Sequence, residues 1–143
     1  MGNTKFRLGF IDEAVKNYKK AIKFNKKNFP AYFNLAHVYS EEKNFDDLKK
    51  VLQDVLKFDE NNTTALNDLG YLNLILGNVD EGRKLFEKVI NIDDKHIRAF
   101  KNYFLITKVE KDNKFLKKLE NIDLSKANDE DKIFAYTLSL IHI

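Results

Sequence analysis

Apolar side chains recur at steps of three and four residues along most of the chain. Leu69, Leu72 and Ile75 form one such run, and a second run follows at residues 85–90. This spacing places apolar side chains on one face of an α-helix, whereas a β-strand would alternate apolar and polar positions. The pattern predicts helices at residues 12–25, 30–42, 46–58, 64–76, 80–92, 97–109, 113–121 and 130–141.

The same pattern repeats every 34 residues. Alanine stands at this offset three times, as Ala31, Ala65 and Ala99. Other columns agree in size or charge, namely Leu35, Leu69 and Tyr103; Asp12, Asp46 and Asp80; and Ile22, Leu56 and Ile90. Each period holds two helical runs joined by a short turn. We therefore expect the repeating unit to be a pair of antiparallel helices.

Three glycines interrupt the helical runs, although each one in a helix interior costs about 0.5–1 kcal/mol relative to alanine. Gly77 lies in a turn and is expected to end a helix in the left-handed conformation, with Asp80 capping the next helix. Gly70 and Gly82 are expected where two helix backbones approach closely. Gly9 aligns with Gly77 and is expected to end a helix too.

The stretches AYFNLAHVY (31–39), ALNDLGYL (65–72) and GFIDEAVKNYKKAI (9–22) resemble the tetratricopeptide repeat family, whose period is 34 residues. The usual proline at the end of each repeat is replaced here, by Lys26, Glu60 and Asp94. The resemblance implies an all-α fold, a right-handed α-solenoid of antiparallel helix pairs. We expect a single domain over residues 1–143, made of a partial repeat 1–28, repeats 29–62 and 63–96, a degenerate repeat 97–130 and a partial helix 131–143.

Composition and motifs favour a binding protein over an enzyme. The 25 basic and 22 acidic residues leave a net charge of +3, which does not favour nucleic acid as a partner. No apolar run approaches the roughly 20 residues of a membrane helix, and the absence of cysteine fits a cytoplasmic protein. His37, His96 and His142 show no metal-ligand spacing, and no nucleotide-binding or nucleophile motif occurs. We expect no catalysis, cofactor or metal.

Polar residues at the repeat offset point to a binding face. Asn34, Asp68 and Asn102 fall on the first helix of each pair, which lines the concave side of such solenoids. The resemblance implies an asparagine ladder that grips the backbone of an extended peptide, as in the repeats of O-linked N-acetylglucosamine transferase. An amide suits this role because it both donates and accepts hydrogen bonds. The candidate peptide-binding residues are Asn34, His37, Asn67, Asp68, Tyr71, Arg98, Lys101 and Asn102, with Leu105 on the same face.

The alternative for Asn34 and Asn102 is that they are ordinary polar surface residues. The two-carboxylate clamp of chaperone-binding members of the family is poorly matched, because Asp68 would place a negative charge where a C-terminal carboxylate needs cations. We favour a scaffold that binds a protein or peptide. A second interpretation is the repeat arm of an enzyme such as a sulfotransferase or glycosyltransferase. A third, an RNA-binding helical repeat, lacks the expected 35-residue period and basic groove.

Three features suggest that the chain is a fragment. Residues 96–138 resemble the end of the repeat region in repeat-bearing sulfotransferases, through Leu116, Leu119–Glu120 and the acidic segment 129–132. MGNTKFRLG (1–9) aligns with LGYLNLILG (69–77), so we expect the chain to begin within a first helix. The last six residues, LSLIHI (138–143), match the translation of a transposon end used to prepare DNA libraries. We expect no function for them.

Overall fold

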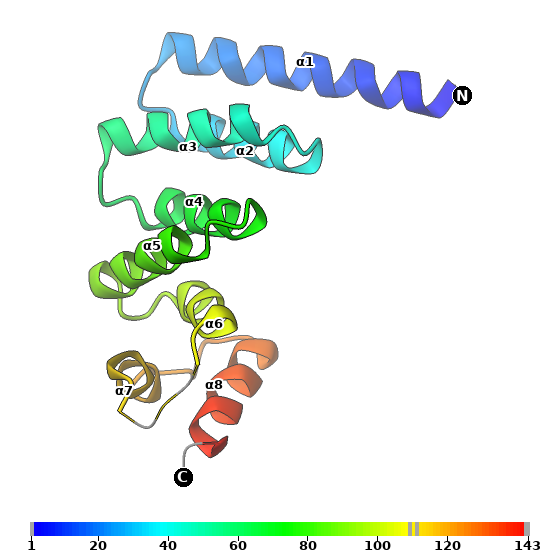
Figure 1. Ribbon diagram of the computed structural model, residues 1–143. Helices are drawn as coiled ribbons and strands as arrows, with labels where there is room; N and C mark the ends of the chain where they lie inside the picture. Colours follow the sequence, from blue (N-terminus) through cyan, green and yellow to red (C-terminus); the bar gives the residue numbers. More distant parts are fainter. Residues whose placement is uncertain (1, 109, 111, 142–143) are drawn as a thin grey trace. The chain divides into compact units, whose positions relative to one another are not determined.

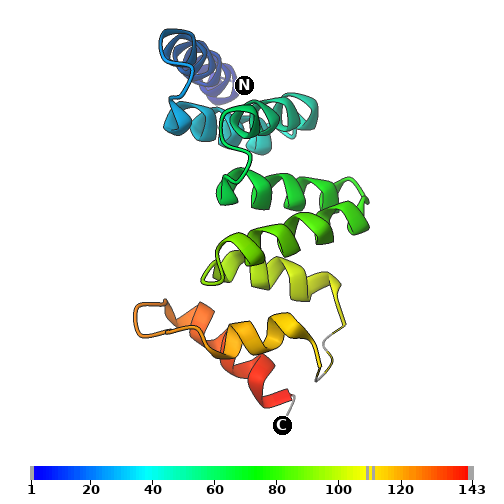
Figure 2. The ribbon, with the colours of Figure 1, turned by 90° about the vertical axis from the view of Figure 1, so that its left-hand side faces the viewer.

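The computed structural model describes residues 2–108, 110 and 112–141. These residues form α-helices and no strand (Figures 1 and 2), which confirms the predicted all-α fold. The helices are α1 (Gly2–Phe24), α2 (Phe29–Glu41), α3 (Phe45–Phe58), α4 (Thr63–Ile75), α5 (Val79–Ile92), α6 (Ile97–Ile106), α7 (Lys114–Glu120) and α8 (Asp129–Ile141). They form two compact units, Met1–Ala65 and Leu66–Ile143.

In the first unit, α2 packs against both α1 and α3. The core consists of apolar side chains at the predicted helical spacing, and Leu52 and Val55 of α3 are fully buried. Asn28 and Asn44 cap α2 and α3, because each side-chain oxygen accepts a backbone N–H from the first turn of its helix.

Helix α1 differs from the prediction. It is continuous from Gly2 to Phe24, so Gly9 does not end a helix. Turns of the expected kind occur at Lys43, with φ 54°, and at Gly77, with φ 81°, which stand one repeat apart. Each is followed by an asparagine at the N-cap of the next helix, whereas Gly9 is followed by Phe10. Phe10 is a residue type disfavoured at an N-cap, and the helix continues through the glycine.

In the second unit, α4 and α5 lie side by side in both views (Figures 1 and 2). A Cβ atom on Gly70 would lie 2.7 Å from Cε1 of Phe86. One on Gly82 would lie 2.9 Å from the backbone oxygen of Gly70. The two glycines therefore permit the close approach of the two helices, as predicted.

Asp80 does not cap α5, contrary to the prediction. The helix already begins at Val79, its N-cap is Asn78, and Asp80 pairs with Arg83 within the first turns. Asn78 occupies the N-cap position directly after the left-handed Gly77, although its side chain makes no capping hydrogen bond.

In the last part of the second unit, α6 and α7 are shorter than the helices of the repeats before them, with 10 and 7 residues. Helix α6 packs against α5 and α7, and α7 packs against α8. An aromatic cluster joins α6 to α7, with the rings of Tyr103 and Phe115 4.9 Å apart in an edge-to-face arrangement. Helix α6 ends at Ile106 because Thr107 is extended, although the sequence predicted a helix to residue 109, which lies outside the described residues.

Candidate peptide-binding site

The first helices of the repeats begin at a shared set of caps. Asn28, Asn62 and His96 stand at the 34-residue offset, and each accepts the backbone N–H three residues further on, at 3.2, 3.0 and 3.2 Å. His96 uses Nδ1 for this bond. Burial is the largest cause that lowers the pKa of His96, and the nearby charge of Arg98 lowers it further. These caps were not predicted from the sequence, although the three residues stand at the repeat offset.

In the second unit, four predicted residues of α4 and α6 form one polar cluster. Nδ2 of Asn102 donates to Oδ1 of Asn67 at 3.1 Å. Nδ2 of Asn67 approaches Oδ1 of Asp68 at 3.4 Å, and a guanidinium nitrogen of Arg98 donates to the same oxygen at 3.0 Å. Asn67 is only 1% exposed, so its amide is held in a single orientation by both neighbours. We call these four residues the amide cluster.

The charge of Asp68 is balanced within the amide cluster. Burial raises the pKa of the Asp68 carboxyl, while Arg98 and the amide of Asn67 act in the opposite direction. Both partners of the ion pair remain partly exposed, so the pair contributes only about 0–1 kcal/mol to stability. The cluster therefore carries little net charge itself, and it offers hydrogen-bond donors and acceptors to a ligand.

Lys101 is turned toward α8. Its Nζ lies 2.6 Å from Oδ1 of Asp131, 3.2 Å from Oε1 of Glu130 and 5.9 Å from the ring centre of Phe134. The hydrogen bond to Asp131 is the main cause that raises the pKa of Lys101. The α8 partners were not among the predicted site residues, and the acidic start of α8 was the signal that could have indicated them.

The remaining predicted residues are exposed. Tyr71 lies one turn after the amide cluster on α4 and is 50% exposed, and Leu105 lies exposed on α6. Asn34 and His37 lie exposed on α2, in the first unit. The structure therefore brings together Asn67, Asp68, Arg98 and Asn102. Among the residues it describes, no group of three or more histidines or acids could hold a metal ion.

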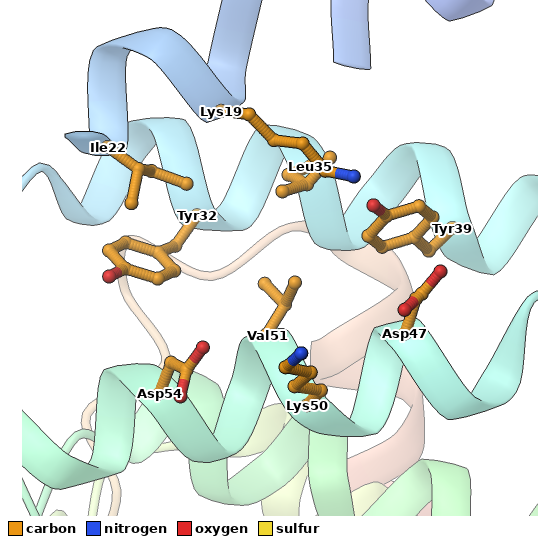
Figure 3. A pocket seen from close by; sticks show the side chains of 9 residues that line it. All are labelled: Lys19, Ile22, Tyr32, Leu35, Tyr39, Asp47, Lys50, Val51 and Asp54. Carbon is orange, nitrogen blue, oxygen red and sulfur yellow. The ribbon is translucent and has the colours of Figure 1, made fainter. Parts of the chain in front are cut away.

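A hollow of about 190 Å³ lies between α1, α2 and α3 in the first unit (Figure 3). The rings of Tyr32 and Tyr39 stand at its two ends, with apolar side chains between them. Burial raises the pKa of Tyr32, and the charge of Asp54 adds to this. The hollow is lined by Lys19, Ile22, Tyr32, Leu35, Tyr39, Asp47, Lys50, Val51 and Asp54. It is smaller than the roughly 300 Å³ of the smallest typical ligand sites, and two lysines balance two aspartates. We interpret it as a packing seam.

None of the helices in the described part of the chain is both long and apolar enough to cross a membrane. Helix pairs repeating every 34 residues, with a partly exposed polar cluster on α4 and α6, define a helical-repeat binding module. Residues 2–42 match the family description "TPR repeat", and residues 29–62 and 63–96 match "Tetratricopeptide repeat". The chain belongs to the tetratricopeptide repeat family.

Solved structures share this fold. The first TPR of Spaghetti (RPAP3), bound to the HSP90 peptide SRMEEVD, is 24% identical with a TM-score of 0.61, over 73% of this chain and 83% of that one. The second TPR domain of human RPAP3, in complex with the HSP70 peptide SGPTIEEVD, is 22% identical with a TM-score of 0.61, over 76% and 90%.

A third similar structure is the C-terminal TPR-containing domain of a putative FK506-binding protein from Plasmodium falciparum. It is 26% identical with a TM-score of 0.56, over 73% of this chain and 80% of that one. Comparison with curated protein sequences gave no match.

Proposed function

We propose that the chain is a protein-interaction module that binds an extended peptide segment along its first helices, through the amide cluster of α4 and α6. The observation that carries this proposal is the buried Asn67 side chain, which is fixed between Asn102 and Asp68. A buried amide with a fixed orientation holds its neighbours in place as well. This preorganisation lowers the entropy cost of binding a flexible ligand.

The chemistry of the amide cluster suits a peptide backbone. Asn102 uses its side-chain nitrogen to bond Asn67, which leaves its side-chain oxygen as an acceptor for a peptide N–H. Arg98 is 57% exposed at its side chain and has further N–H groups for a peptide carbonyl. Alternating donors and acceptors along an extended backbone match these two groups without requiring a particular side chain.

We further propose that the partner segment is uncharged or of mixed charge. The peptides bound by the RPAP3 domains carry two successive glutamates before a valine and a final aspartate. Here the cations of this face are already paired, Arg98 with Asp68 and Lys101 with Glu130 and Asp131. An acidic C-terminus would meet like charges from these carboxylates, so we expect weak binding of such peptides.

Selection of peptides from a random display library, followed by titration calorimetry, tests the proposal. Asn102→Ala should weaken a selected peptide about tenfold, in line with the loss of one backbone hydrogen bond in a partly buried site. Asn17→Ala, at an exposed position on α1, is the matched control and should leave affinity unchanged. Selected peptides that bind the Asn102 variant with unaltered affinity would show that the face is wrongly chosen.

A further inference from the structure

A second hollow, of about 530 Å³, lies between α6 and α8 in the second unit. Its size falls within the range of about 300–1,000 Å³ that is typical of ligand sites. The side chains that line it are mostly apolar. They are Lys101, Asn102, Phe104, Leu105, Glu130, Ile133 and Phe134, together with Leu138 of the C-terminal segment 138–143, to which no role in binding is assigned.

The apolar walls of this hollow are open to water. Leu105 is 73% exposed and Ile133 is 66% exposed, although both are large aliphatic residues. Phe104 is buried and Phe134 is half buried, so aromatic rings form the less exposed part of the lining. Covering Leu105 and Ile133 with another apolar group would remove apolar surface from water, which is favourable.

The charged residues at the edge of the hollow satisfy one another. Lys101 bonds both Glu130 and Asp131, and its ammonium group faces the ring of Phe134. The edge therefore carries two carboxylates for one ammonium. This balance does not attract an anionic lipid surface or an acidic side chain.

Asn102 connects the hollow to the amide cluster, because it lines the hollow and also bonds Asn67. In an extended peptide, successive side chains point to opposite sides of the backbone. A peptide that bonds Asn102 through its backbone would therefore direct one side chain into the neighbouring hollow.

We propose that the hollow between α6 and α8 receives one bulky apolar side chain, of the leucine, methionine or phenylalanine kind, from the bound peptide. This inference rests on the proposed function and adds a sequence requirement to it. The amide cluster holds the backbone of the partner, and the hollow selects the residue. The partner is then an extended segment with a large apolar residue among uncharged or mixed-charge neighbours.

Nuclear magnetic resonance titration of the whole ¹⁵N-labelled chain tests this inference. The probes are three capped peptides, acetyl-Gly-Ser-X-Ser-Gly-amide, with leucine, serine or glutamate at X. We expect the leucine peptide to cause saturable shifts at Asn102, Leu105 and Ile133 and to bind about tenfold more tightly than the serine peptide. The glutamate peptide should bind no better than the serine peptide.

Leu105→Asp and Ile133→Asp should each bring the leucine peptide down to the affinity of the serine peptide. Both residues are largely exposed, so these variants should fold. Phe24→Asp, at a side chain that is 96% exposed in the first unit, controls for the added charge and should change nothing.

Three results would overturn the inference in distinguishable ways. If all three peptides bind equally and Asn102→Ala weakens them all, the hollow has no selective role while the proposed function stands. If no peptide shifts any residue of α4 or α6, the proposed function fails with it. If the natural chain self-associates without any peptide and Leu105→Asp does not, the hollow binds a second copy of the chain instead.

Discussion

The cap of α6 makes the stability of the second unit depend on pH. Asn28 and Asn62 cap the equivalent helices with an amide oxygen, which does not titrate, whereas His96 uses Nδ1. Nδ1 accepts the N–H of Ala99 only while it is unprotonated, which requires the tautomer with its proton on Nε2. Protonation therefore removes the cap.

The direction of the effect follows from the pKa of His96. Burial and Arg98 lower that pKa in the folded chain from 6.5, so the unfolded chain binds the proton more readily. The free energy of unfolding is then largest above the unfolded pKa. It falls as the pH decreases through about 6.5, and the loss is complete below the folded pKa. A capping bond of this kind contributes about 1 kcal/mol, which sets the size of the loss.

The test compares urea unfolding of the natural chain and His96→Asn between about pH 8 and pH 5, followed by circular dichroism. As the pH falls, we expect the free energy of unfolding of the variant to rise by about 1 kcal/mol relative to that of the natural chain, because asparagine caps the helix at every pH. Asp68 is present in both proteins, so its effect on the pH dependence largely cancels in the difference between them. His37→Asn, at an exposed position that caps no helix, is the control. Parallel pH profiles for His96→Asn and the natural chain would refute the reasoning.

Three further predictions concern stability, each measured as a change in the free energy of unfolding in urea. Lys43→Gly should stabilise the first unit by about 1 kcal/mol, since Lys43 occupies the left-handed conformation that Gly77 holds one repeat later; a loss would show that the lysine side chain matters there. Gly70→Ala should destabilise by about 1–3 kcal/mol because the added methyl meets the fully buried Phe86 ring, whereas Gly9→Ala, with open space around it, should stabilise by about 0.5–1 kcal/mol; the same sign for both would contradict the packing argument. Asn67→Ala should cost about 1–3 kcal/mol through the loss of its buried amide, and a neutral result would mean that the amide cluster is not held by this residue.

The fold was predictable because its signal is repeated. The apolar spacing and the 34-residue columns define each helix pair several times, and the roles of Gly70, Gly77 and Gly82 follow from their places in that pattern. The error at Gly9 has a local cause, since the turns at Lys43 and Gly77 are each followed by an asparagine at the N-cap position, whereas Gly9 is followed by Phe10. The repeat offset pointed to α4 and α6, which carry the amide cluster.

The partners of these polar residues were less predictable. The bond between Asn67 and Asn102 depends on how α4 and α6 pack, which the repeat pattern specifies only to within a turn. The contacts of Lys101 depend on α8, which follows a degenerate segment with no matching columns. The caps at Asn28, Asn62 and His96 could have been predicted, because the column contains two asparagines directly before the first helices.

Hydrogen exchange of the whole chain, measured by mass spectrometry with and without a selected peptide, tests the central claim most directly. A ligand stabilises the elements that it contacts, so the backbone amides of α4 and α6 should exchange more slowly when the peptide is bound. Helices α3 and α5, the second helices of their repeats, should change less. Protection confined to α3 and α5, or no protection at a peptide concentration that saturates binding, would contradict the assignment of the binding face.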